Sequence, residues 1–202
     1  HNPMCSAFVS PFVDAAFNDC IFMWDSCFML MFGKYADKYF PFQKTLDNFY
    51  ALQHRDGFIG REISEKDGSE KFSRHDPSGT GPNIMAWCEY EYYKFTGDIE
   101  RLNNVFEPLL AYHQWLRNNR TWKDGSYFSS GWGCGMDNMP RLRGNDDKWF
   151  SHNHMTWCDT CMQQLLNCRI LIKIAAILKR DDIDDIIEEQ HKLSLWVNEN
   201  LW

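Results

Sequence analysis

Two kinds of helical segment alternate along this chain of 202 residues. The first kind is apolar on nearly every side, as in residues 24–38 and 155–179, and a helix of this kind has to be buried. The second kind carries a single apolar stripe at the helical period, as in residues 98–117 and 182–200. A fold that satisfies both kinds places the apolar helices in an inner layer and the amphipathic helices outside them. The fold class that we predict is therefore all-α.

The helices come in three pairs, and residues with special backbone preferences mark their ends. We expect the pairs to be residues 24–38 with 41–57, 82–97 with 98–117, and 155–179 with 182–200. Pro41 suits the first turn of a helix, Gly57 and Gly97 suit helix ends, and Asp98 suits an N-cap. No segment shows the sustained alternation of apolar and polar residues that is typical of a strand. Three αα-hairpins form an open arc, not a closed ring.

Two long polar stretches, residues 58–81 and 118–153, separate the pairs. Both are rich in glycine, and the second also contains many Trp, Asp and Asn residues. A connection of this length inside a compact domain is usually functional or disordered. We therefore look for a binding site there, and first in residues 131–141, which read GWGCGMDNMPR.

The composition argues against two classes of partner. The formal net charge is −7 and lysine and arginine do not cluster, which speaks against a nucleic-acid surface. The sequence has no run of about 18 apolar residues, the length that a membrane-spanning helix needs. The chain opens on His1 without a visible signal peptide, and the compartment stays unknown. Aromatic residues make up 16% of the chain, which suits both a thick core and a sugar-stacking surface.

The chain has eight cysteines, of which Cys158, Cys161 and Cys168 follow helical spacing in an apolar segment. Cysteine in such a position packs as a small hydrophobic residue, and we predict reduced core thiols. Cys158 and Cys161 could instead form half of a zinc site, with His152 and His154 nearby. No second pair with the usual spacing accompanies them, so we expect no metal.

Motifs at the predicted helix starts and in the second loop occur in a fixed order. They are Trp24-Asp25-Ser26, the stretch GPNIMAW from Gly81 to Trp87, the stretch GMDNMPR from Gly135 to Arg141, and Asp159 at the head of an apolar run. Together they resemble the trehalase and glycoside hydrolase family 63 group, the six-hairpin (α/α)6 toroid glycosidases. The resemblance spans residues 22–178 and implies that the three hairpins are about half of a toroid.

The resemblance also implies a reaction. Members of this group hydrolyse an α-linked glucoside or mannoside from its non-reducing end with inversion, using a pair of carboxylic acids. The general acid falls on Asp137, with Trp24 and Asp25 in the pocket of the terminal sugar. The other substrate-binding residues that the resemblance implies are Trp132, Asn138 and Arg141. It implies no metal and no organic cofactor.

The chain departs from the group in two places. Members often have Gln-Pro-Pro where this chain has Gly81-Pro82-Asn83. The general base is a Glu on a later hairpin, and nothing after Leu178 resembles its motif. We therefore expect residues 1–202 to be one partial domain, truncated on its C-terminal side and inactive alone. Apolar surface of the first and fifth helices would then need cover from the rest of the domain or from a complementary chain.

Each candidate residue also has a structural interpretation. Asp137 and Asn138 could form an Asx turn, and Asp25 could be a helix cap or a first-turn acid. We expect Trp87 in the core and Asp159 in a structural role. Glu91 falls on an apolar stripe, where we expect its side chain either to reach solvent or to be paired. The acidic run 181–189 is typical of a solvated helix face.

Two rival functions stay open. The chain could belong to a carbohydrate-binding or scaffold protein that kept the sugar pocket without the general base. It could also belong to a toroid enzyme of another kind, such as a sugar epimerase, for which His113, His152 and His154 are the candidate bases.

Overall fold

The computed structural model describes residues 7–15, 17–136 and 155–201. Its α-helices are α1 (Met23–Gly33), α2 (Thr45–Ala51), α3 (Met85–Thr96), α4 (Ile99–Asn119), α5 (Cys158–Leu178) and α6 (Asp184–Asn200). Two short strands, β1 (Cys20–Phe22) and β2 (Glu62–Ser64), form an antiparallel pair in which Phe22 lies opposite Glu62. Single 3-10 turns occupy Lys34–Ala36, Phe42–Lys44 and Pro77–Gly79.

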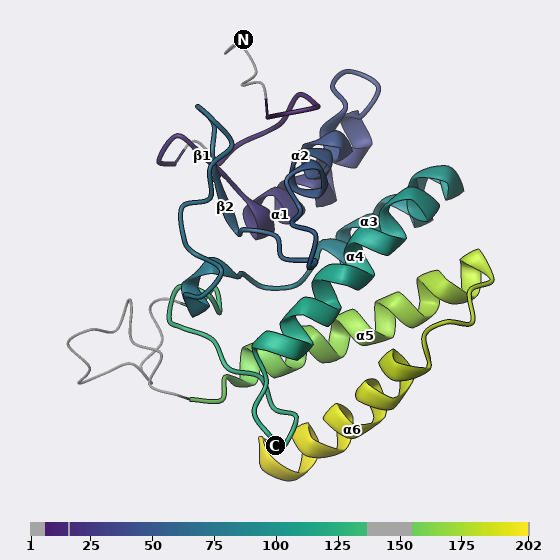
Figure 1. Ribbon diagram of the computed structural model, residues 1–202. Coiled ribbons are helices and arrows are strands. Elements are labelled where there is room, and N and C mark those ends of the chain that lie inside the picture. Colours follow the sequence, from purple (N-terminus) through teal and green to yellow (C-terminus); the bar gives the residue numbers. More distant parts are fainter. Residues whose placement is uncertain (1–6, 16, 137–154, 202) are drawn as a thin grey trace.

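The helices form three αα-hairpins in an open arc, as the sequence predicts (Figure 1). Helix α3 packs against α1 on one side and α5 on the other, which makes these three the inner row. Helices α2, α4 and α6 cover α1, α3 and α5 respectively. By length and apolar composition alone α5 could cross a membrane. Its contacts with α3, α4 and α6 account for that apolar character, because they enclose α5 on several sides.

The second predicted helix is shorter than expected. It forms only as the turn Phe42–Lys44 followed by α2, which ends at Ala51. Gly57 therefore does not end a helix. Its φ is +97°, and a Cβ there would lie 2.4 Å from the Ala111 carbonyl oxygen on α4. Glycine at this position lets the chain approach α4 closely.

The end of α3 and the start of α4 lie where the sequence predicts them. Gly97 adopts the left-handed conformation directly after α3, and the Asp98 side chain accepts a hydrogen bond from the Arg101 backbone N–H at 2.9 Å. The two strands, in contrast, are absent from the sequence prediction. With three residues each, β1 and β2 are too short to display an alternating pattern.

Helix α3 buries an acid that the sequence analysis did not single out. The carboxylate of Glu89 is 1% exposed, whereas Glu91 is half-buried and pairs with Lys94 at 2.7 Å. Arg101 donates to both Glu89 oxygens, at 2.8 and 2.7 Å. Gln43 and Tyr50 donate to the same carboxylate, at 2.9 and 3.0 Å. This network joins the first hairpin to the second.

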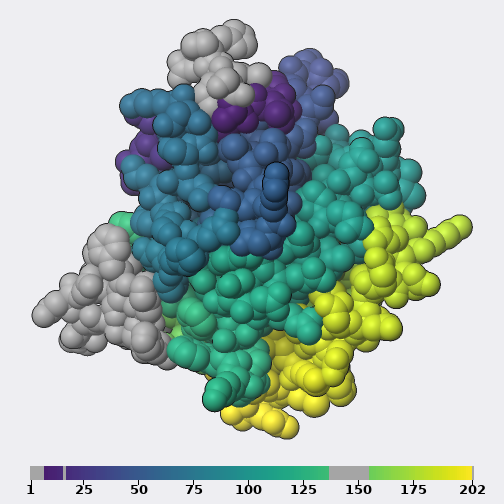
Figure 2. Space-filling view, in the orientation of Figure 1, coloured from purple at the N-terminus to yellow at the C-terminus, as the bar shows by residue number. Residues whose placement is uncertain are grey.

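The acidic run at the start of α6 also needs a correction, because it is not uniformly solvated. Glu188 is exposed, but the Glu189 side chain is only 10% exposed and its carboxylate lies against His113 of α4. Burial by itself would raise the pKa of Glu189. Hydrogen bonds from His113 and Tyr127 outweigh it and hold that pKa below its ordinary value. In the space-filling view, side chains of α4 and α6 meet along one face (Figure 2).

Several apolar side chains of the inner helices α1 and α5 are exposed. Phe28 and Phe32 on α1 are 46% and 66% exposed, and Met162 and Leu166 on α5 are 55% and 39% exposed. These are the two helices for which the sequence predicts uncovered apolar surface.

The Glu89 network gives a prediction for stability. Replacing Arg101 by Met should lower the free energy of unfolding by about 3–5 kcal/mol, because it leaves a buried carboxylate without its cation. Chemical denaturation followed by circular dichroism measures this change. Arg180 is the matched control, because it pairs with Glu107 and Asp182 at the surface and Arg180→Met should change little. Equal effects of the two substitutions would contradict the prediction.

Candidate active site

A cavity of about 480 Å³ opens at the end of the arc where β1 leads into α1. The structure brings together there three of the residues that the sequence singles out, namely Trp24, Asp25 and Trp132. Gly135 also lines the cavity, two positions before Asp137. Asp137, Asn138 and Arg141 lie outside the described residues.

The strand pair sets the position of Trp24 and Asp25. The backbone N–H of Met23 donates to the Arg61 carbonyl at 2.8 Å, so that α1 starts beside β2. Phe22 is the N-cap residue and Asp25 lies in the first turn of α1. A carboxylate in a first helical turn is stabilised by the helix dipole. Asp25 is therefore a first-turn acid and also borders the cavity.

Arg61 organises the aromatic wall of the cavity. Its guanidinium group lies over the Phe72 ring at 4.6 Å and over the Trp132 ring at 5.9 Å. Phe72 and Trp132 meet edge to face with their ring centroids 5.5 Å apart. The Arg61 Nε also donates to the Ser78 carbonyl at 2.6 Å, which limits its movement. The wall is thus a pair of rings held by one cation.

Glu62 is a cavity residue that sequence reasoning missed. It is 5% exposed, and its carboxylate lies 3.4 Å from Arg61 Nη2. Burial raises the pKa of Glu62 above its ordinary value, and Arg61 and Lys71 offset only part of that rise. One feature of the sequence could have indicated Glu62. The charged residues Arg61 and Glu62 follow the apolar Phe58 and Ile59 closely in a loop that contains glycine.

The loop that carries Trp132 is tied to the segment before α3. The hydroxyl groups of Ser78 and Ser130 are hydrogen-bonded at 2.7 Å, and both residues are fully buried. Gly135 has a φ of +75°, and a Cβ there would lie 2.8 Å from Pro82 Cγ and 3.2 Å from the Trp24 ring. The chain leading to Asp137 therefore runs directly against Trp24.

Asn83, which the family resemblance marks as a departure from the expected motif, has a structural role. Its side-chain amide donates to Gln164 Oε1 of α5 at 2.7 Å, and both residues are buried. Asn83 does not line the cavity. It joins the start of α3 to α5.

The other singled-out residues lie away from this cavity. Trp87 packs against the core, with its ring 6.4 Å from that of Phe28. None of Cys158, Cys161 and Cys168 forms a disulfide, as predicted, and Cys158 is only half-buried. His113 is fully buried on α4 and does not line the cavity. His152 and His154 lie outside the described residues.

Residues 20–202 match the mannosylglycerate hydrolase MGH1-like glycoside hydrolase domain. The chain belongs to this family. An uncharacterized conserved protein of known structure from Thermus thermophilus is 18% identical, with a TM-score of 0.75 over 96% of this chain and 59% of its own. The GH63 mannosylglycerate hydrolase of the same organism, solved in complex with glucose, is 18% identical with a TM-score of 0.74 over the same shares. The three hairpins are therefore part of an (α/α)6 toroid.

A curated relative is much longer than the region it shares with this chain. It is an uncharacterized protein of Borreliella burgdorferi that is 26% identical over 109 residues, which make up 54% of this chain and 23% of the relative. The chain thus spans less than two thirds of the relatives that it matches, both in sequence and in structure.

Two glycines test how tightly the loop sits against Trp24. Gly135 and Gly125 both have positive φ, but a Cβ at Gly125 would meet nothing within 4 Å. Gly125→Ala should cost about 1–2 kcal/mol of unfolding free energy from backbone strain alone. Gly135→Ala should cost about 1–3 kcal/mol more, because the methyl group overlaps Pro82 and Trp24. Urea denaturation followed by tryptophan fluorescence measures both, and equal costs would show that the contact is loose.

Proposed function

We propose that the protein carrying this chain is an inverting, exo-acting hydrolase of α-mannosides or α-glucosides. The chain would supply the terminal-sugar pocket and the general acid. The proposal rests on the cavity that is lined by Trp24, Asp25 and Trp132, in a member of a glycoside hydrolase family. Gly135, two positions before Asp137 in the sequence, lines the same cavity.

Asp137 would donate a proton to the leaving glycosidic oxygen. A general acid must stay protonated at the working pH, which requires an apolar setting or a neighbouring carboxylate. The sequence around Asp137 supplies apolar neighbours in Met136, Met139 and Pro140. The second carboxylate would activate water from the opposite face of the sugar, about 6.5–9.5 Å from the acid.

The cavity residues suit sugar binding. Trp24 and Trp132 offer aromatic faces for a pyranose ring, and the Asp25 carboxylate offers acceptors for sugar hydroxyls. Asn138 and Arg141 would contact the same sugar from the loop. The neighbour from Thermus thermophilus is a mannosylglycerate hydrolase, and mannosylglycerate is therefore the first substrate to test.

The general base would come from the part of the toroid that this chain does not span. The structural neighbours are longer, since the matched region is 59% of their chains. The exposed apolar residues of α1 and α5 are the surface on which the remaining hairpins would pack. A complementary chain with a matching apolar surface would serve equally well.

The rival candidate is a carbohydrate-binding protein without turnover. It rests on the same cavity, because stacking rings and hydroxyl acceptors bind a sugar whether or not a base is present. Isothermal titration with mannose and glucose, together with an assay for released sugar, distinguishes the two. Binding without hydrolysis by the full-length protein would favour the rival.

Asp137→Asn in the full-length protein tests the general acid. For an alkyl α-mannoside, kcat/KM should fall about 10²–10⁴-fold, because the leaving alkoxide needs a proton. For a dinitrophenyl α-mannoside the fall should be much smaller, because that leaving group departs as a stable anion. Asp181→Asn, at an exposed residue shortly before α6, is the control and should leave both rates unchanged. Equal losses on the two substrates would remove Asp137 from the acid role.

The 202-residue chain by itself tests the location of the base. Compared with the full-length protein, it should hydrolyse the aryl mannoside at least about 10²-fold more slowly, because the water-activating carboxylate is missing. Both proteins are assayed at equal concentration, after circular dichroism has shown that each is folded. Full activity with inverted product from the short chain would place the base within these residues.

A further inference from the structure

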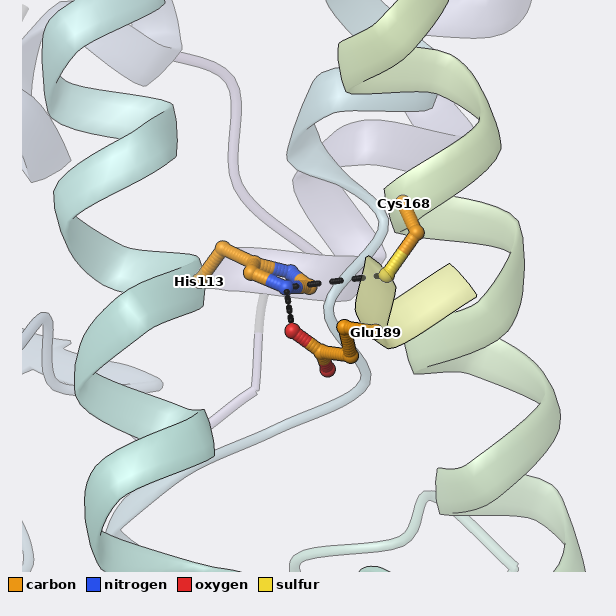
Figure 3. A group of neighbouring side chains, drawn as sticks. All are labelled: His113, Cys168 and Glu189. Atoms are coloured by element: carbon orange, nitrogen blue, oxygen red, sulfur yellow. Dashed lines mark hydrogen bonds and ion pairs between the residues drawn. The ribbon is translucent and has the colours of Figure 1, made fainter. Parts of the chain in front are cut away.

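A second cluster of reactive side chains lies between α4, α5 and α6, away from the cavity that is proposed to bind the sugar. His113 of α4, Cys168 of α5 and Glu189 of α6 point toward one another (Figure 3). His113 Nε2 lies 2.9 Å from Glu189 Oε2 and 3.7 Å from Cys168 Sγ. The three candidate ligand atoms all lie within 4.8 Å of one another. His113 and Cys168 are fully buried, and none of the three lines the sugar cavity.

The atom types match those that bind zinc. Imidazole nitrogen, thiolate sulfur and carboxylate oxygen bind Zn²⁺ at about 2.0–2.3 Å, often with water in the fourth position. One thiolate and one carboxylate together carry two negative charges. They would neutralise a divalent ion in a place where an uncompensated charge is costly.

The neighbours of the cluster hold two of the ligands in position. The Tyr127 hydroxyl donates a hydrogen bond to Glu189 Oε1, which leaves Oε2 facing His113. Asn167 Nδ2 lies 2.9 Å from His113 Nδ1, while Asn167 Oδ1 is buried without a hydrogen-bond partner among the described residues. Exchanging the positions of Oδ1 and Nδ2 in the Asn167 amide lets Oδ1 accept a hydrogen bond from Nδ1–H of His113. That tautomer leaves the lone pair on Nε2, and such hydrogen bonds are typical of metal-binding histidines.

A route from solvent reaches the cluster at Glu189. A cavity of about 350 Å³ is lined by Tyr127 and Glu189, together with Arg117, Asp124, Glu188 and Lys192. It offers a path for an ion and room for a water molecule as the fourth ligand. Arg117 Nε lies 3.7 Å from Glu189 Oε2 and is the cation that a bound metal would displace from that oxygen.

We propose that His113 Nε2, Cys168 Sγ and Glu189 Oε2 bind a divalent transition metal of the zinc class. The ion would join α4, α5 and α6 in the outer part of the arc. On binding, the Cys168 S–H bond breaks, the metal–sulfur bond forms with the sulfur electron pair, and the proton leaves to water in the cavity. The zinc site that the sequence suggests as an alternative lies at Cys158 and Cys161, so substitutions of Cys161 and Cys168 distinguish the two sites.

Cobalt titration of the metal-stripped, full-length protein tests this site. Co²⁺ is the probe, because a cobalt–thiolate bond adds a charge-transfer absorption in the near ultraviolet. We expect about one Co²⁺ per chain in the wild type, and displacement of the spectrum by Zn²⁺. Cys168→Ser should abolish the charge-transfer band, and Asn167→Ala should weaken binding about 10–100-fold.

Cys161→Ser is the matched control, because Cys161 is an equally buried free thiol on the same helix. Its titration should equal that of the wild type. Far-ultraviolet circular dichroism and gel filtration establish that each variant is folded before titration. Glu189→Gln, which keeps the shape of the side chain, gives a second variant if Cys168→Ser fails to fold, and it should weaken cobalt binding.

Two results would overturn the proposal. One is a folded wild type without saturable cobalt binding, which leaves His113 and Glu189 as a metal-free hydrogen-bonded pair. The other is a band that survives Cys168→Ser and disappears in Cys161→Ser, which moves the ion to the other cysteines. Neither measurement uses glycosidase activity, so the outcome is independent of the function proposed above.

Discussion

Helices α1 and α5 carry apolar side chains on most of their surface, and water has to be kept from them on several sides at once. Lateral packing of α1, α3 and α5 covers two sides of α3 but only one side each of α1 and α5. Helices α2, α4 and α6 cover the outside. Some apolar side chains of α1 and α5 stay exposed, among them Phe28 and Met162. The same requirement for burial explains the hairpin pairs, and the exposed side chains of α1 and α5 are apolar surface that the described residues do not cover.

This arrangement also explains why the cavity beside Trp24 is built from loops, the strand pair and the first turn of α1. The inner helices are filled with side chains that pack on one another, so polar groups that must meet a ligand lie at the helix ends. Loops can hold such groups in place only if something fixes them. Here the strand pair fixes the start of α1, and Arg61 holds the aromatic wall of the cavity. The Ser78–Ser130 hydrogen bond ties the Trp132 loop to the segment before α3.

The buried polar clusters around Glu89 and Glu189 differ in their hydrogen bonding and in their access to solvent. Around Glu89 the cation Arg101 donates to both carboxylate oxygens, and Gln43 and Tyr50 complete the bonding. Such a closed network suits a structural role. Around Glu189 the Arg117 guanidinium lies farther away, a thiol lies in contact with His113, and a cavity reaches the group. The second cluster therefore has both the ligand types and the access that a metal site requires.

Sequence alone determined the local features of this protein. The two kinds of helix, the Gly97–Asp98 boundary and the alternating pairs follow from periodicity and backbone preference, which act over a few residues. The family resemblance singled out Trp24, Asp25 and Trp132 as candidates, and the structure places all three at one cavity. The strands were missed because their pairing joins residues some forty positions apart, and three residues carry no period.

Tertiary structure alone decided which polar side chains are buried and with what. Helical spacing drew attention to Glu91, yet the acid that meets Arg101 is Glu89. The acidic composition of residues 181–189 predicts a solvated helix face. Glu189 instead points inward to His113, 76 positions away in the chain. The physical reason is the same in both cases. A charged group can be buried only where distant parts of the chain supply its hydrogen bonds, and no local pattern in the sequence specifies those partners.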